Sequence, residues 1–245
     1  MIGSETATAD SGSVVTALVA HGDDNLVLAQ RLGEWISNAP ELEEDIALGN
    51  IALDHLGVAR ALYTHAGEIE GRGRTEDDFA MRRAEREFLN VLLVEQPNGD
   101  FAHTMVRALF FDAYQVDLWE GMTASDDETL SGIAARAGKE ARYHLLHSSA
   151  WVVRLGDGTE ESHRRAQNAV DALWRFTGEL FQGPGQVSPQ RWRAAIEEVL
   201  DEAGLGIPDD PHQRGGGRRG LHSEHLGPLL AEMQWMQRSY PGLQW

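Results

Sequence analysis

The chain has 245 residues, 42 % of them hydrophobic and none of them cysteine. The lack of cysteine excludes disulfides, zinc–thiolate sites, iron–sulfur clusters and thiol nucleophiles. Asp and Glu number 39 against 21 Lys and Arg, a formal net charge of −18. This charge disfavours a nucleic-acid partner and an anionic membrane surface, because both would repel the chain. No apolar run approaches the roughly 20 residues that span a bilayer, and we expect a cytoplasmic protein.

The N-terminal segment has little hydrophobic pattern. Residues 1–13 are rich in Gly, Ser, Thr and Ala and also carry Glu5 and Asp10. They lack the basic start and the apolar block of a secretion signal. We therefore predict a disordered tail over residues 1–20 and a single domain over residues 21–245.

Helical periodicity dominates the rest of the chain. It predicts helices over residues 21–35, 40–71, 78–95, 101–122, 125–155, 161–181, 189–203 and 221–239. Pro40 is suited to open a helix, Gly71 to end one, and Pro97-Asn98-Gly99 to form a turn. Short connections favour antiparallel neighbours. The sequence thus predicts an all-α fold, with four long helices in a bundle and shorter helices around it.

One helix face suggests a metal site. Glu140, His144, His147 and Trp151 recur at offsets that place them on one side of a helix. A di-iron site in a four-helix bundle takes one Glu from each of two helices and Glu-x-x-His from each of the other two. In this chain Glu140 is followed at the third position by Tyr143 instead of histidine.

The second predicted helix has the same deficiency. Asp54 is followed at the third position by Gly57, and the neighbouring His55 is expected to point about 100° away. The closest match to the motif is His222-Ser223-Glu224-His225, at a helix start. The ligand set is therefore incomplete.

We accordingly predict that this chain binds no metal and no other cofactor. Asp54, Asp112, Glu140 and His144 would form a degenerate polar seam whose charges pair internally. The alternative is a free-standing di-iron oxygenase or ferroxidase that uses the same four residues.

Two other stretches are candidate sites. Arg218 and Arg219 follow three glycines in the one concentrated basic patch of an acidic chain. They would contact an anion or a partner, or belong to a solvated linker. Glu87-Phe88-Leu89-Asn90 falls inside a predicted helix, where Asn90 is unfavourable unless it caps an end or faces a polar pocket.

Several blocks together resemble a known family, the C subunits of bacterial phenylacetyl-CoA epoxidases. The resemblance covers nearly all the chain after His21 and includes the closing Leu-Gln-Trp, although residues 182–188 form a shorter connection than is usual. The blocks are Asp24-Asn25, Gln30–Trp35, Ala39–Glu43, Leu53–Arg60, Leu92–Phe101, Lys139–Leu145, Leu173–Thr177 and Gly220–Gly227.

The resemblance implies a ferritin-like fold and a structural role. In that family a similar A subunit carries the di-iron centre, a small B subunit bridges the assembly, and a reductase supplies electrons from NADPH. Oxygen is split, and one atom epoxidises the ring of phenylacetyl-CoA. The resemblance also implies that Glu87, Phe88, Leu89 and Asn90 help to line the substrate region.

Partner contacts would require exposed apolar helix faces. Trp35, Trp119, Trp151 and Trp174 are candidates, although each also suits a core position. A third interpretation is a free-standing helical binding module without a complex, which co-purification with a second ferritin-like chain would exclude.

Overall fold

The structure is a computed structural model that describes residues 3–209 and 212–242. Within these residues every regular element is a helix, which confirms the predicted all-α class, and none is long and apolar enough to cross a membrane. The elements in chain order are α1 (Gly3–Gly33), α2 (Leu42–Glu70), α3 (Glu76–Met81), η1 (Glu85–Glu87), α4 (Leu92–Glu95), α5 (Phe101–Met122), α6 (Glu128–Gly156), α7 (Glu160–Leu173), η2 (Trp174–Phe181), α8 (Pro189–Glu202), η3 (Gly217–Arg219) and α9 (Leu226–Ser239).

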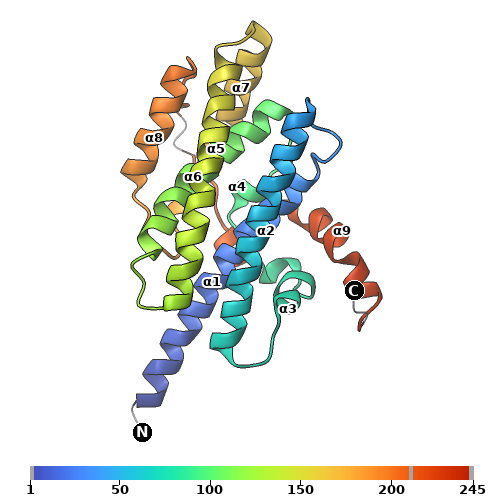
Figure 1. The fold of residues 1–245 in the computed structure, drawn as a ribbon, viewed down its shortest axis with the longest axis vertical. Helices are drawn as coiled ribbons and strands as arrows, with labels where there is room; N and C mark the ends of the chain where they lie inside the picture. Colours follow the sequence, from blue (N-terminus) through green and yellow to red (C-terminus); the bar gives the residue numbers. More distant parts are fainter. Residues whose placement is uncertain (1–2, 210–211, 243–245) are drawn as a thin grey trace.

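The four long helices α1, α2, α5 and α6 form the bundle (Figure 1). α1 packs on α2, α5 on α6, and α2 on α6. A hydrogen bond from Gln115 Nε2 to Asn25 Oδ1 joins α5 to α1. A second one, from Trp35 Nε1 to Thr104 Oγ1, joins α5 to the turn that follows α1. α7 and α8 cover α5 and α6, whereas α3 and α9 contact each other on another side of the bundle. The predicted ferritin-like bundle with flanking helices is confirmed.

The predicted helix boundaries hold where a local signal marks them. Gly71 ends α2 in the left-handed region at φ 67°, and Gly99 adopts φ 60° in the turn before α5. Asp100 caps α5 by accepting a hydrogen bond from the His103 backbone N–H, and Asp127 caps α6 in the same way. These side chains supply the partners that the first helical N–H groups otherwise lack.

The prediction of a disordered tail over residues 1–20 was wrong for the described part of that segment. α1 begins at Gly3, and Leu18, Val19 and Ala20 are buried. The apolar run from Val14 to Ala20 continues the helical pattern and packs on the core. Burial of this run stabilises the helical conformation of residues 14–20, the C-terminal part of the predicted tail. Met1 and Ile2 lie outside the described residues.

The helix predicted over residues 78–95 was also wrong. Only α3 and α4 at its two ends are α-helical. Between them, the backbone N–H groups of Leu89 and Val91 donate to the carboxylates of Asp23 and Asp24 on α1. These distant acceptors take donors that a helix would use internally. The helix predicted over residues 161–181 likewise changes to a 3-10 helix at Trp174.

Candidate functional site

The segment Glu87–Asn90 begins at the last residue of η1, continues with an irregular backbone and lies against α1. Phe88 and Asn90 are fully buried, Leu89 is half-buried and Glu87 is exposed. Of the four residues predicted to line a substrate region, therefore, only Glu87 and Leu89 reach the surface of this chain. Phe88 and Asn90 instead fix the position of the segment.

Asp23 on α1 holds the first half of this segment. Its carboxylate accepts hydrogen bonds from the Leu89 backbone N–H at 2.7 Å and from the Tyr63 hydroxyl at 2.5 Å. It also forms a buried ion pair with Arg83, whose guanidinium lies 4.2 Å from the centre of the Phe88 ring. Burial, and then the charge of Asp23, raise the pKa of Tyr63 well above its usual value. Tyr63 therefore acts as a hydrogen-bond donor in this network.

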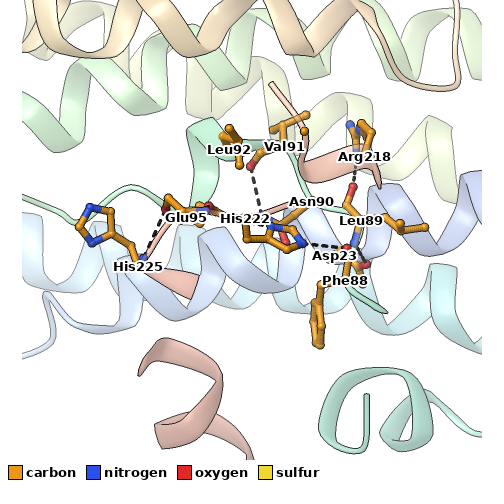
Figure 2. Close-up of polar contacts among 12 residues, drawn as sticks. Asp23, Phe88, Leu89, Asn90, Val91, Leu92, Glu95, Arg218, His222 and His225 are labelled. Atoms are coloured by element: carbon orange, nitrogen blue, oxygen red, sulfur yellow. Dashed lines mark hydrogen bonds and ion pairs between the residues drawn. The ribbon is translucent and has the colours of Figure 1, made fainter. Parts of the chain in front are cut away.

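Asp24, the next residue, binds Arg218. The Arg218 guanidinium donates to both Asp24 carboxylate oxygens, at 3.0 and 2.6 Å. It also donates to the Leu89 carbonyl oxygen at 2.9 Å (Figure 2). The side chain is only 9 % exposed. Arg218 thus does not offer its charge to an anion at the surface, contrary to the prediction, whereas the neighbouring Arg219 is exposed.

The glycine-rich loop packs closely against the same segment. A Cβ atom on Gly217 would lie 2.0 Å from the Asn90 carbonyl oxygen, closer than non-bonded atoms can approach. Buried Glu179 ties the loop down, because its carboxylate accepts from the backbone N–H of Gly216 at 2.7 Å and from that of Leu92 at 2.8 Å. The loop is therefore part of the packed structure, and the solvated-linker interpretation was wrong for Gly216–Arg218.

A second acid–base pair holds the end of the segment. Glu95 accepts hydrogen bonds from Asn90 Nδ2 at 2.9 Å, from His222 Nδ1 at 2.8 Å and from the Ser223 backbone N–H at 2.6 Å. His222 Nε2 lies 2.8 Å from the Phe88 carbonyl oxygen, as Figure 2 shows. Both ring nitrogens face acceptors, so the imidazole donates twice and is cationic. His222 therefore belongs to this network, and the resemblance of residues 222–225 to a metal motif has no counterpart in the geometry.

A surface cavity of about 560 Å³ borders these groups. It lies where the glycine-rich loop, α4 and η2 meet. Its lining residues are Leu92, Gln96, Phe176, Gln213, Arg214, Gly215, Leu221, His222, Ser223, Glu224 and His225. The glycine-rich loop and the residues that follow the segment thus form the walls of a hollow at the surface of the chain.

The predicted polar seam differs from its expected arrangement. His144 Nε2 contacts Asp54 Oδ2 at 3.2 Å, but Asp112 accepts from the Ser148 hydroxyl and Glu140 pairs with Arg136. The four residues do not pair with one another as a set. Of the internal pairs predicted among these four residues, the contact between His144 and Asp54 is the one that forms.

His55 lies inside the bundle, where Asp54 was expected. It is 2 % exposed, whereas the side chain of Asp54 is 37 % exposed. His55 shares the buried stripe of α2 with Leu48, Ile51 and Leu62, at helical offsets of seven, four and seven. That stripe is the signal in the sequence that could have identified His55, because the spacing of carboxylates alone does not show which side of α2 is buried.

The centre of the bundle carries little charge. Burial lowers the pKa of His55 well below its usual value and lowers that of His144, while burial raises the pKa of Asp112 to about 8. Each shift favours the neutral form, because a charge deprived of water is costly. The seam near neutral pH therefore consists mainly of neutral polar groups.

These residues do not fit a di-iron centre. Such a centre takes four carboxylates and two imidazoles from the four helices. In the part of the chain that the structure describes, Asp112 is the one fully buried carboxylate beside the two imidazoles, since Asp54 lies at the rim and Glu140 turns to Arg136. Asn25 and Gln115 occupy the α1 and α5 positions next to them.

Apolar side chains are exposed on α2 and α6. On or near α2 they are Ile36, Leu42, Ile46, Leu53 and Leu56, and on α6 they are Tyr143 and Leu146. A groove of about 370 Å³ between the end of α1 and α2 includes four of them, Ile36, Ile46, Leu53 and Leu56. The tryptophans considered for partner contacts are poorer candidates, because Trp119 and Trp174 are buried and Trp35 and Trp151 are half-buried against the core.

Comparisons with known proteins agree with this architecture. A model of the family described as "Phenylacetic acid catabolic protein" matches residues 3–245. The chain is 51 % identical over 238 residues to the C subunit of the 1,2-phenylacetyl-CoA epoxidase of Escherichia coli (strain K12). That match covers 91 % of this chain and 96 % of the relative, so it includes the bundle and segments that pack on it.

Proposed function

Since the chain belongs to the phenylacetic acid catabolic protein family, we propose that it is the non-catalytic C subunit of a cytoplasmic phenylacetyl-CoA epoxidase. The observation that carries this proposal is the carboxylate count beside the two buried imidazoles. Among the described residues Asp112 is the one buried carboxylate grouped with His55 and His144, whereas a di-iron centre takes four. The oxygen chemistry then belongs to a partner subunit. The free-standing di-iron oxygenase has no comparable support.

The proposed assembly divides the reaction between chains. A ferritin-like A subunit holds the di-iron centre, a small B subunit bridges the complex, and a reductase delivers electrons from NADPH. One atom of oxygen enters the ring of phenylacetyl-CoA as the epoxide and the other leaves as water. This chain supports the catalytic subunit and helps to shape the site for the CoA thioester.

The exposed apolar residues of α2 and α6 are the surface that we propose for the catalytic subunit. Leu53 is 65 % exposed and Leu146 is 71 % exposed, on two helices that pack against each other. Obligate interfaces usually bury more than about 2,000 Å² and are strongly apolar. An exposed apolar surface of this kind marks a binding site in many soluble proteins.

Co-purification with the catalytic subunit tests this surface. Leu53→Lys combined with Leu146→Lys should reduce recovery of the catalytic subunit on the tagged chain at least about tenfold, because a buried lysine charge is costly. Met236→Lys on α9 replaces another exposed apolar residue and serves as the matched control. Unchanged recovery with the double variant, or equal loss with the control, would contradict the proposed surface.

We also propose a substrate role for the segment Glu87–Asn90, in which the buried and the exposed residues act differently. Buried Phe88 and Asn90 would set the backbone, while Leu89 and Glu87 would border the substrate region. Exposed Arg219 is a cation near this segment that could contact the CoA phosphates or a partner.

Steady-state kinetics of the reconstituted complex separate these roles. Leu89→Ala and Arg219→Ala should raise the KM for phenylacetyl-CoA with little change in kcat, as expected when uniform substrate binding is lost. Arg193→Ala, an exposed arginine on α8, is the control for Arg219. A fall in kcat alone, at unchanged KM, would argue against a substrate-binding role.

A further inference from the structure

Three side chains from three helices meet inside the bundle. His55 on α2, Asp112 on α5 and His144 on α6 each place one potential ligand atom within 4.8 Å of the others. Their exposed fractions are 2 %, 3 % and 2 %. The His55 and His144 rings lie 5.0 Å apart between their centres.

Each imidazole is oriented by a hydrogen bond through only one of its nitrogens. His55 Nδ1 lies 2.8 Å from Asn25 Oδ1, an acceptor, and His144 Nε2 lies 3.2 Å from the carboxylate of Asp54. These nitrogens therefore carry the protons. The opposite nitrogens, His55 Nε2 and His144 Nδ1, are buried and have no hydrogen-bond partner among the described residues.

The remaining nitrogens thus present lone pairs in a site without donors for them. A buried acceptor without a partner is destabilising because its desolvation is not compensated, and a bound cation would supply a partner for both nitrogens. An imidazole that donates one N–H to a carboxylate or an amide oxygen while the other nitrogen binds a metal is the usual arrangement around protein metal ligands. Ser148 orients Asp112 in the same manner, by donating to its Oδ2 at 2.8 Å.

We propose that His55, Asp112 and His144 bind a single divalent transition-metal cation. Two imidazole nitrogens and one carboxylate suit Zn²⁺, Fe²⁺ or Co²⁺, with bonds of about 2.0–2.2 Å. Two ligands at that distance are at most about 4.4 Å apart, so any pair of ligand atoms at the 4.8 Å limit must approach by at least about 0.4 Å. The cation links α2, α5 and α6. This proposed metal site goes beyond the proposed function, which needs no metal in this chain.

Cobalt titration of the untagged full-length chain tests the site. After treatment with a chelator, the chain should bind one Co²⁺ and show visible d–d absorption, and Zn²⁺ should displace it. Asp112→Asn, which keeps the size of the side chain, should weaken Co²⁺ binding by about 100-fold or more, beyond the 10- to 100-fold typical of outer-shell changes. His55→Gln should have the same effect.

His147→Gln is the matched control. His147 lies on the same helix as His144 but contacts Glu44 at 2.8 Å, outside the cluster, and its loss should leave Co²⁺ affinity unchanged. Far-ultraviolet circular dichroism verifies that each variant is folded. Absence of saturable binding at roughly millimolar Co²⁺, a regime of weak affinity, would overturn the proposal, as would wild-type affinity in both ligand variants. The catalytic subunit is not needed, so failure here leaves the proposed function to its own test.

Discussion

The buried pair of Glu95 and His222 should make a large contribution to the stability of the chain. Both side chains are 0 % exposed and their charged atoms are 2.8 Å apart. Replacing His222 by Ala leaves the Glu95 carboxylate buried without its cation and the Phe88 carbonyl oxygen without its donor. Breaking a buried ion pair from one side costs about 3–5 kcal/mol. For a chain of this size we expect the melting temperature to fall by roughly 10 °C.

The stabilisation that His222 provides should decrease as the pH rises. Burial alone would lower the pKa of His222, but the hydrogen bond and the charge of Glu95 outweigh it and raise the pKa above its usual value. The folded state therefore keeps a proton that the unfolded chain releases near pH 6.5. The stabilisation is complete below about pH 6.5 and is lost as the pH rises through the folded-state pKa.

Urea denaturation followed by tryptophan fluorescence measures this effect between about pH 5 and pH 9, the range around the histidine pKa. The free-energy difference between wild type and His222→Ala should shrink towards the alkaline end. His225→Ala is the control, because its ring is 35 % exposed and lies 3.8 Å from the exposed Glu224. Equal stability of the two variants, or a difference that grows with pH, would refute the assignment of a buried imidazolium.

Three further predictions concern other parts of the chain. Arg218→Ala should destabilise the chain by about 3–5 kcal/mol in urea denaturation, whereas Arg219→Ala should change its stability by less than about 0.5 kcal/mol; equal effects would show that Arg218 is not internally paired. Gly217→Ala should lower the melting temperature through its clash with the Asn90 carbonyl oxygen, and a neutral result would contradict the close packing. Asp112→Asn should stabilise the metal-free chain near pH 7. The raised pKa of Asp112 makes the stability of the wild type fall between about pH 4 and pH 8. A stability difference between Asp112→Asn and wild type that does not grow over this range would contradict that pKa.

Local signals in the sequence were sufficient for most of the bundle. Gly71 and the turn at Asn98-Gly99 marked helix ends because their backbone requirements depend on a few neighbouring residues. The helix over Phe101–Met122 was predicted with the boundaries that the structure shows. Here, periodicity and turn chemistry agree with the tertiary structure.

Contacts between distant residues explain the errors. The interruption at Leu89 and Val91 depends on carboxylates more than sixty residues earlier in the chain, and no local pattern reports such acceptors. Arg218 was expected at the surface because its loop is rich in glycine, but its partner Asp24 is 194 residues away. A charged residue next to glycines can therefore be an internal contact when another buried charge faces it.

Two residues of the buried cluster were identified from the sequence, and the third was missed. Helical positions pointed to Asp112 and His144, and the structure brings these two residues together. His55 was set aside because Asp54 was assumed to face inward, and the two differ by about 100° on a helix. The buried stripe of α2, rather than the spacing of a known motif, determines which of the two lies inside.

The iron content of the isolated chain, purified from iron-supplemented cells, tests the central claim most directly. Elemental analysis should be combined with near-ultraviolet absorption, which reports an oxo bridge between two irons. A structural subunit with the residues described above should hold at most one metal ion per chain and show no oxo-bridge band. Two irons per chain with that band would mean a di-iron centre in this bundle, and the chemistry would then belong to this chain rather than to its partner.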